Sequence, residues 1–324
     1  MLDVFDLQNF PRIDRKIFTW AWLNPTIGTY NWQVWQKPRG VNFAHLFALG
    51  GGGGGGNGIA GSLGAAGGGG GGASGNQTSM ILPIWALPDI LYISVAGPVA
   101  AAASGDSTVI SVTPSVFNSD NSQILINISP NGGATNGTIS AGGSGGAASA
   151  TNPSNNFITP GAWWSTTGGI YTTPGSAGSN GGFNAIGQAK TLPTDSPTIA
   201  LGGCGGAGLA AVAGVSYTGG SYTQPTQPTI DNFNNPPAGG AGAASATSNG
   251  SDGISGSLVF TPGVFNFFYG GTGGGSGGTT SGNGGNGGNG GIGCGGGGGG
   301  GCLTGFTPGT GGQGGPGIVV ITCW

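Results

Sequence analysis

Residues 45–58 read HLFALGGGGGGGNG, so a short apolar run leads directly into seven consecutive glycines. A second stretch, GIGCGGGGGGGCLTGF at residues 291–306, repeats the arrangement, and GGPGIVVITCW follows at residues 314–324. Glycine loses more conformational freedom on folding than any other residue, so a long glycine run is ordinarily a linker. The fold therefore depends on why the longest glycine runs adjoin the segments that most resemble buried strands.

The composition favours an ordered protein over a disordered or collagen-like one. Glycine supplies 80 of the 324 residues, apolar residues make up 36%, and charged residues make up 5%. Disordered chains usually combine low hydrophobicity with high net charge, but here the net charge is only −3 and eight Trp and 14 Phe are present. Collagen needs glycine at every third position, and this chain has contiguous glycines instead. A nucleic-acid partner is not expected, because the chain has no basic face.

Neither a secretory signal nor a membrane-spanning helix is predicted. Asp3 and Asp6 lie where a signal peptide carries positive charge. The longest apolar stretch, residues 80–103, is interrupted by three prolines and by Asp89. We interpret it as two strands around an LPD turn.

Composition divides the chain into three regions: an N-terminal segment (1–40), a strand-rich part (41–130) and a glycine-rich part (131–324). The first region is either a docking segment or an ordinary edge strand, and the residues leave both interpretations open. Its candidate docking residues are basic or aromatic: Arg12, Arg15, Lys16, Trp20, Trp22, Trp32 and Trp35.

Apolar runs separated by turn signals predict an all-β fold with little or no α-helix. Residues 41–49 are apolar on both faces, as in a strand covered on both sides, so His45 is interpreted as a core histidine and not a catalytic one. Further strands are predicted at MILPIWA, ILYISVAG, STVISVTP, SQILINISP and GIVVITCW, the last pairing with early strands. We expect these strands to form an antiparallel β-sandwich or jelly-roll-like arrangement.

The glycine runs predict a polyglycine II bundle attached to these strands. An extended threefold helix makes no internal hydrogen bonds, so its N–H and C=O groups point outward to neighbouring chains. Only glycine lets chains approach closely enough on all sides for those bonds to form. Asn283, Asn286 and Asn289 recur at every third residue, which would place them along one edge. Strands thus deliver the chain into a bundle that glycine allows to pack densely.

The side chains needed for catalysis or metal binding are scarce. There is one histidine, no glutamate, and no close pair of aspartates beyond Asp3 and Asp6, so the protein is not expected to be an enzyme. No metal site or cofactor is predicted, because Cys204, Cys294, Cys302 and Cys323 form no Cys-x-x-Cys pair. Cys294 and Cys302 would pair only if the chain turned back between them; the alternative is buried free thiols.

The chain resembles the glycine-rich domains of bacteriophage virion proteins, especially tail-fibre tip adhesins. The resemblance rests on Trp35, Lys37, Pro38 and Gly40 before a strand that enters a glycine run, on the second run, and on the closing strand. It resembles more loosely the glycine-rich extracellular region of anaplastic-lymphoma-kinase-type receptors. The adhesin resemblance implies a virion-surface location, loops that touch a bacterial surface receptor or glycan, and other virion proteins or further copies of the chain as partners.

The leading hypothesis is therefore a structural and adhesive virion protein. Its candidate receptor contacts are aromatic residues set among small ones: Trp163, Trp164, Tyr171, Tyr217, Tyr222, Phe265, Phe267, Phe268 and Tyr269. The alternative for 265–271, FNFFYGG, is an apolar plug at the bundle end. Other hypotheses are a capsid or tail decoration protein without receptor binding, an ice-binding protein, and a secreted glycine-rich matrix protein.

Overall fold

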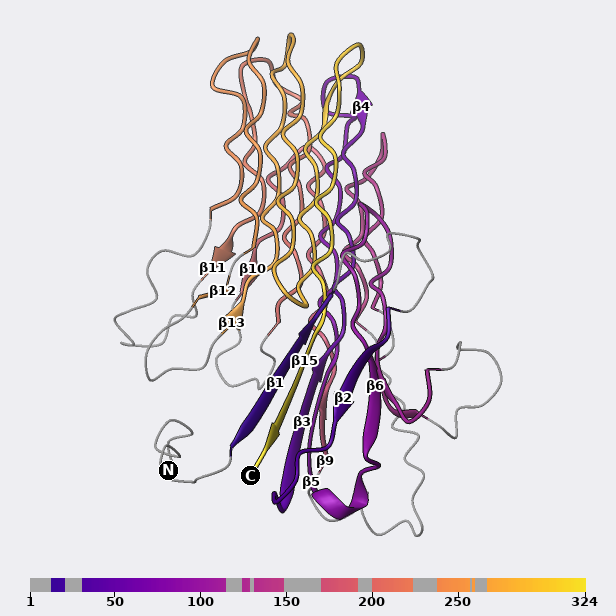
Figure 1. The fold of residues 1–324 in the computed structure, drawn as a ribbon. Helices are drawn as coiled ribbons and strands as arrows, with labels where there is room; N and C mark the ends of the chain where they lie inside the picture. Colours follow the sequence, from indigo (N-terminus) through magenta and orange to yellow (C-terminus); the bar gives the residue numbers. More distant parts are fainter. Residues whose placement is uncertain are drawn as a thin grey trace.

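A computed structural model describes residues 13–20, 31–114, 124–128, 131–148, 170–191, 200–223, 238–256, 258–259 and 267–324. The described chain forms an elongated molecule with two parts (Figure 1). Strands make up the lower part, and a bundle of extended, winding chains rises above them. The C-terminus lies at the strand end, away from the turns that close the top of the bundle.

The lower part is an antiparallel β-sandwich, as the sequence predicted. One sheet has the order β1 (Asp14–Thr19), β15 (Ile318–Cys323), β3 (Phe43–Leu49), β5 (Gln77–Pro83) and β9 (Ile170–Thr173). The other has the order β2 (Gln33–Gln36), β6 (Ile90–Ser94), β7 (Thr108–Ser111) and β8 (Ile124–Ile128). The strands come from all three regions into which composition divides the chain.

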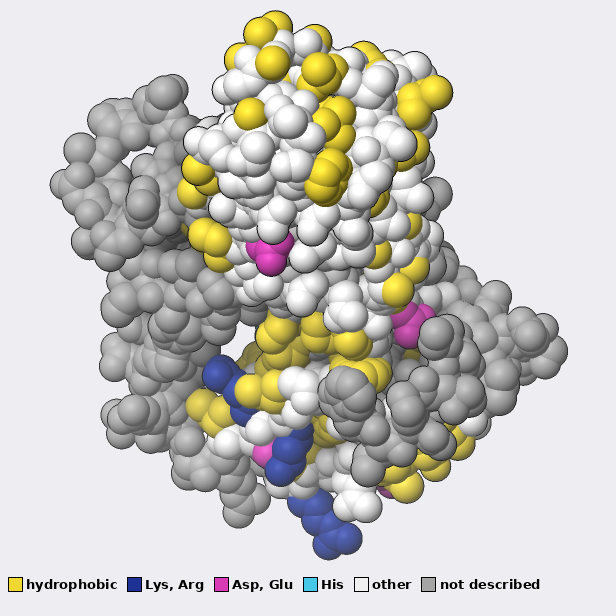
Figure 2. Space-filling view, turned by 90° about the horizontal axis from the view of Figure 1, so that it is seen from above, with side chains coloured by type: hydrophobic (Ala, Val, Ile, Leu, Met, Phe, Trp, Pro, Cys, Tyr) yellow, Lys and Arg dark blue, Asp and Glu magenta, His cyan; other side chains and the backbone are white. Residues whose placement is uncertain are grey.

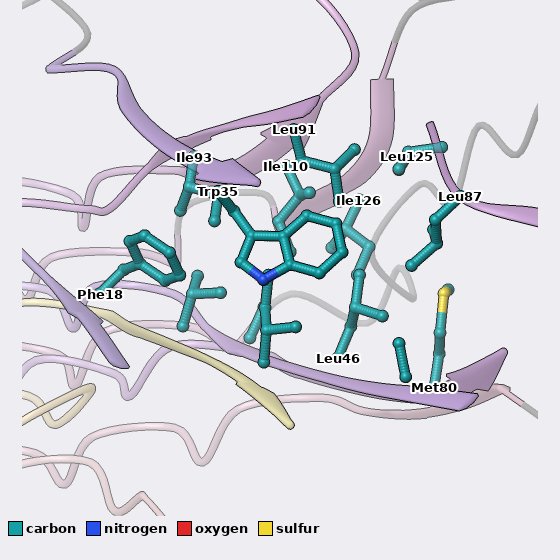
Figure 3. Close-up of a cluster of buried hydrophobic side chains, with 14 of the residues drawn as sticks. Phe18, Trp35, Leu46, Met80, Leu87, Leu91, Ile93, Ile110, Leu125 and Ile126 are labelled. Carbon is teal, nitrogen blue, oxygen red and sulfur yellow. The ribbon is translucent and has the colours of Figure 1, made fainter. Parts of the chain in front are cut away.

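Strand alternation builds the core between the two sheets. On β3, Ala44, Leu46 and Ala48 are fully buried and face the other sheet, while the exposed Phe43 starts the opposite face and stacks on Trp324. The indole of Trp35, on β2, lies at the centre of the core, among the apolar side chains drawn in Figure 3. Burial of such a core is the main stabilising term of the sandwich.

The burial of Trp35 corrects one expectation. Trp35 was a candidate docking residue, but its side chain is only 2% exposed and is therefore unavailable to a partner. Its position on a strand explains why: Val34 and Gln36 take the exposed face of β2, so Trp35 must face inward. Trp20 packs partly buried against the same core.

The N-terminal region forms edge strands of the two sheets where it is described. β1 pairs with β15 alone, with Asp14 opposite Cys323, and β2 pairs with β6 alone. Arg15 and Lys16 are exposed on β1, and Trp32 is half-buried. Arg12 and Trp22, also docking candidates, lie outside the described residues.

The upper part is a polyglycine II bundle, which the hydrogen bonds of residues 50–58 make plain. The N–H groups of Gly52, Gly55 and Gly58 donate to Gly315, Gly312 and Gly309 at 2.9 Å each, three residues apart on both chains. The N–H groups of Gly53, Gly56 and Ile59 donate instead to Ala73, Gly70 and Gly67. Successive residues therefore bond to different neighbours, which is the signature of a threefold extended helix.

Residues 295–301, seven consecutive glycines, occupy the interior of this bundle. Their N–H and C=O groups bond to six different segments, which are 53–56, 69–72, 201–207, 271–277, 285–288 and 309–312. A methyl group would collide with main chain here: a Cβ at Gly297 would lie 2.0 Å from the carbonyl oxygen of Thr272. Glycine is required because every side of this chain faces another chain.

Short strand pairs complete the bundle. β4 (Ala60–Gly61) pairs with β14 (Cys302–Leu303) in parallel near the top. β10 (Lys190–Thr191) pairs with β11 (Tyr222–Thr223), and β12 (Leu258–Val259) pairs with β13 (Phe267–Phe268). The only helical turn in the described residues is the 3-10 turn Ile84–Ala86 after β5, so the all-β prediction is confirmed.

All four cysteines are free and buried, as one of the two alternatives stated. Cys294 and Cys302 cannot pair, because the chain between them runs straight through the bundle. Eight residues at the rise of this helix span about 25 Å, whereas disulfide Cα atoms lie about 6 Å apart.

Candidate functional site

The top of the bundle is a row of turns, and we call this surface the tip. It is formed by the turns at residues 62–65, 138–141, 183–186, 210–215, 244–248, 279–282 and 303–306. Each turn reverses one extended chain so that it re-enters the bundle. The tip lies at the end of the molecule opposite the C-terminus (Figure 1).

Neighbouring turns of the tip are tied to one another. The N–H of Gly64 donates to Ala210 O at 3.1 Å, that of Ala211 to Asn184 Oδ1 at 2.8 Å, and that of Gly214 to Thr279 Oγ1 at 2.8 Å. Gly214 has φ = 80°, a conformation that side chains disfavour, and this allows the tight reversal. The tip is therefore one connected surface whose turns are held by the bundle beneath them.

Exposed apolar side chains lie on four of these turns. Ile139 and Val212 are each 64% exposed and Ile186 is 60% exposed, and they are joined by Leu63, Phe183 and Val215. Figure 2, seen from above, shows yellow hydrophobic side chains in several patches over a mostly white surface, and the dark blue Lys and Arg side chains lie beside other yellow side chains in the lower part of the view. Exposed apolar side chains also lie on the sandwich, among them Ile17, Ile81 and Trp85, so the tip is distinguished by carrying them on uncharged turns and not by their number.

The tip turns contain no Asp, Lys, Arg or His. A partner would therefore be held by burial of apolar area and by hydrogen bonds to Ser, Thr, Asn and main-chain groups. Such contacts depend little on salt concentration, unlike contacts between surface charges.

Two of the predicted receptor contacts are core residues instead. Tyr222 is 2% exposed and Tyr269 is 3% exposed, and their rings pack edge to face with centroids 5.3 Å apart. The hydroxyl of Tyr222 donates to Gly202 O at 2.6 Å. For Tyr269, the plug interpretation of 265–271 holds. Both rings fill space near the base of the bundle, beside Leu201 and Cys204.

The other predicted contacts do not gather at the tip in the described part of the chain. Tyr217 is half-buried and lies on the bundle side, where its N–H donates to Ser276 Oγ at 2.9 Å. The backbones of Tyr171, Phe267 and Phe268 lie on β9 and β13. Trp163, Trp164 and Phe265 fall outside the described residues.

Sequence reasoning searched for aromatic side chains and so missed the aliphatic tip residues, and it also passed over Phe183. A signal was present: single Leu, Ile or Val residues sit within short Ser, Ala, Asn and Thr segments between glycine runs, as in GSLGAAG at 61–67 and NGTISAGG at 136–143. At most glycine positions of the bundle an added Cβ would collide with main chain, so these segments interrupt the dense packing. Leu63, Ile139 and Val212 lie at turns and are exposed, whereas Leu209, in a similar segment, is buried.

Asparagine side chains cover one edge of the bundle, as their three-residue spacing predicted. The Oδ1 atoms of Asn283, Asn286 and Asn289 each accept a hydrogen bond at 2.9 Å from the next chain, donated by the N–H groups of Thr307, Thr310 and Gln313. At the edge of the bundle no further described chain supplies main-chain carbonyl groups to these N–H groups. The carboxamide oxygen of each asparagine accepts the hydrogen bond instead. The repeat corresponds to about 9 Å along the bundle.

Burial perturbs titratable groups at both ends of the bundle: it raises the pKa of Cys302, which precedes the tip turn 303–306, and that of Cys204 near the base. Burial raises the pKa of the Cys204 thiol to about 12, and a backbone hydrogen bond from Lys190 opposes this shift. Burial, with a smaller contribution from Arg15, lowers the pKa of His45. His45 is half-buried and its Nε2 lies 2.8 Å from Ser79 Oγ, which fits the structural role predicted for it.

Within the described ranges, no helix is long and apolar enough to cross a membrane. No three His, Cys, Asp or Glu side chains come together there as a metal site would require. Compared with known protein families and with curated proteins, the chain matches none.

Proposed function

We propose that the protein is a bacteriophage virion component of the tail-fibre or tail-tip adhesin type, with the tip as its host-contacting surface. The observation that carries the proposal is the separation of two ends: a sandwich at one end, and an uncharged tip with exposed Ile139, Ile186 and Val212 at the other. A rigid bundle between the two ends would hold a binding surface away from its point of attachment.

Rigidity supports this role because binding surfaces lose less entropy when they are already ordered. Each turn of the tip connects chains that are hydrogen-bonded on several sides. The adhesive turns therefore need no aromatic anchors of the kind the sequence suggested. The sandwich, with Arg15 and Lys16 exposed on its edge strand, is the proposed attachment end.

The proposal is tested with phage particles that carry tip substitutions. The triple change Ile139→Ser, Ile186→Ser and Val212→Ser removes the most exposed apolar side chains of the tip. We expect adsorption to host cells to fall at least tenfold while particle yield and composition stay the same. The matched control is Ile254→Ser, since Ile254 is also exposed but lies on the side of the bundle.

Equal adsorption by the triple variant and the control would overturn the adhesive role. Absence of the protein from purified particles, measured by mass spectrometry, would overturn the virion assignment. Particles that adsorb normally but disassemble more readily without the protein would favour a decoration protein instead.

A further inference from the structure

A groove opens on the side of the bundle just below the tip. It has a volume of about 420 Å³, within the range of ligand sites in proteins. Its lining comes from three chains that are far apart in sequence: 57–59, 136–137 and 307–310. The turns at 138–141 and 303–306 adjoin two of these segments, so the groove borders the tip.

The groove is a position in the bundle where one chain is missing. Lower down, that position is filled by residues 99–106: Gly54 N–H donates to Ala103 O, and Ala102 N–H donates to Gly55 O, both at 2.8 Å. Residues 100–103 form a tight turn, in which Ala103 N–H donates to Ala100 O. The segment reverses at this turn and reaches no further toward the tip. Above the turn, residues 57–59 form the floor of an open channel.

Two asparagines replace the missing chain. One helical turn above Gly54, the N–H of Asn57 donates to Asn136 Oδ1 at 2.9 Å. On the wall formed by residues 307–310, the next residue is Gly311, and its N–H donates to Asn57 Oδ1 at 2.8 Å. Each carboxamide oxygen is therefore occupied and its orientation fixed, and among the described residues no group accepts from either Nδ2. The Nδ2 groups are donors held in place at the groove.

The remaining lining is neutral and mixed. Thr307 contributes a hydroxyl group, the Thr310 hydroxyl donates to Asn286 Oδ1 at 2.9 Å, and Ile59 and Pro308 contribute apolar surface. Within the described residues, nothing donates to the carbonyl oxygen of Gly58, the next group that a continuing chain would have bound. None of the described residues that line the groove is charged.

These groups fit the hydroxyl-rich face of a sugar. Hydroxyl groups both donate and accept, so they can take hydrogen bonds from the two Nδ2 groups and give one to a main-chain carbonyl. Sugar C–H groups would contact Ile59 and Pro308. A charged sugar would find no partner for its charge, which costs free energy on burial.

An added peptide chain fits less well. Its carbonyl oxygens would need the N–H groups of Asn57 and Gly311, and those are already bound to side-chain oxygens. A peptide would thus have to break two hydrogen bonds before forming its own. A sugar uses only the groups that are left over.

We propose that this groove binds a neutral hexose or N-acetylhexosamine unit of a surface glycan. The proposal rests on the adhesin function proposed above and names the chemistry of its receptor. It is tested on the purified chain in solution, so its outcome does not depend on particle adsorption.

The sharpest variants are Asn57→Asp and Asn136→Asp. Aspartate keeps the Oδ1 acceptor that caps the neighbouring N–H but replaces the Nδ2 donor with an acceptor. Asn289→Asp is the matched control, because Asn289 caps Gln313 in the same way but lies outside the groove. All three variants should retain the fold, checked by thermal melting.

The probes are an array of neutral hexose and N-acetylhexosamine oligosaccharides, an array of uronic-acid oligosaccharides, and a peptide of repeated Gly-Gly-Asn. We expect binding to at least one neutral oligosaccharide, weakened at least tenfold by either groove variant and unchanged by Asn289→Asp. Absence of binding to every neutral oligosaccharide, equal binding by all variants, or binding of the peptide or acidic sugars alone would each overturn the proposal. Saccharide binding that is lost in Asn136→Asp, combined with unchanged adsorption of the tip variant, would reject the adhesive tip and keep the groove.

Discussion

A Cβ atom on Gly298 would lie 2.0 Å from the carbonyl oxygen of Gly69, a residue 229 positions earlier in the chain. Real Cβ atoms essentially never approach another atom below 3.0 Å. The contact is main chain against main chain, so no side chain can swing away to relieve it. Glycine at position 298 is therefore a packing requirement of the bundle interior.

Gly298→Ala should destabilise the protein by about 3 kcal/mol, the upper end of what overpacking of an interior costs. Gly214→Ala is the comparison, because no atom lies within 4 Å of its Cβ position. That substitution meets only the cost of a positive φ, about 1 kcal/mol. Chemical denaturation measures both. Equal losses for the two variants would contradict dense packing around residue 298.

Amide hydrogen exchange should separate the bundle interior from the tip. The N–H groups of residues 295–301 are all hydrogen-bonded to neighbouring chains, so we expect them to exchange only on large-scale unfolding. Gly305 and its turn should exchange much faster. Rapid exchange throughout 295–301 would show that the glycines do not form a bundle.

The edge asparagines should contribute measurable stability through their oxygen atoms. Asn289→Ala removes the acceptor for Gln313 N–H, and we expect a loss of about 1 kcal/mol. Asn289→Asp keeps the acceptor and should cost less. Thermal melting compares the two variants with the parent chain. A larger loss for aspartate than for alanine would contradict the capping role.

All four cysteines should resist thiol reagents in the folded protein. Burial raises the pKa of Cys204 to about 12 and that of Cys323 to about 11, and it raises the pKa of Cys294 and Cys302 as well. Little thiolate is then present at pH 8, and reagents cannot reach the sulfur atoms. Mass spectrometry after iodoacetamide treatment should find native protein unlabelled and denatured protein with four adducts. Two labels after denaturation without reductant would indicate a disulfide.

Stability should decline at mildly acidic pH through His45. Because burial lowers its folded pKa, the unfolded chain binds the proton more readily. The free energy of unfolding is therefore highest above the unfolded pKa of about 6.5 and falls as the pH drops toward the lowered folded pKa. His45 is the only histidine, so His45→Gln should abolish this decline between pH 7 and 5 in denaturation experiments. A decline that persists in the variant would assign it to other groups.

Strand positions were predictable because burial on a sheet imposes a period of two. The runs at β3, β5, β6, β7, β8 and β15 were all identified, and β15 does pair with the early strand β3. The bundle was predictable because seven glycines in a row have few other ways to be ordered. The sequence could not predict which glycine segments lie next to each other. Glycine segments have no side chains that would distinguish one neighbour, or one alignment along that neighbour, from another.

The candidate site escaped prediction for a related reason. In the sequence, Tyr222 and Tyr269 are flanked by small and polar residues, so they look like surface residues. In the fold, both tyrosine rings are buried against the bundle. Ile139 and Val212 carry no periodic signal, because turns have none. The groove depends on where residues 99–106 stop relative to Asn57, a long-range relation that no local pattern records.

The six partners of residues 295–301 also set an order of assembly. Five of them, from 53–56 to 285–288, leave the ribosome earlier, and the central chain follows them. Until it arrives, the main-chain groups of those five chains that bond to residues 295–301 in the folded protein lack these partners. We therefore expect slow, late closure, with contacts spanning hundreds of residues. A ribosome-bound chain that stops short of residue 295 would lack the central chain of the bundle and the hydrogen bonds that this chain makes to its neighbours.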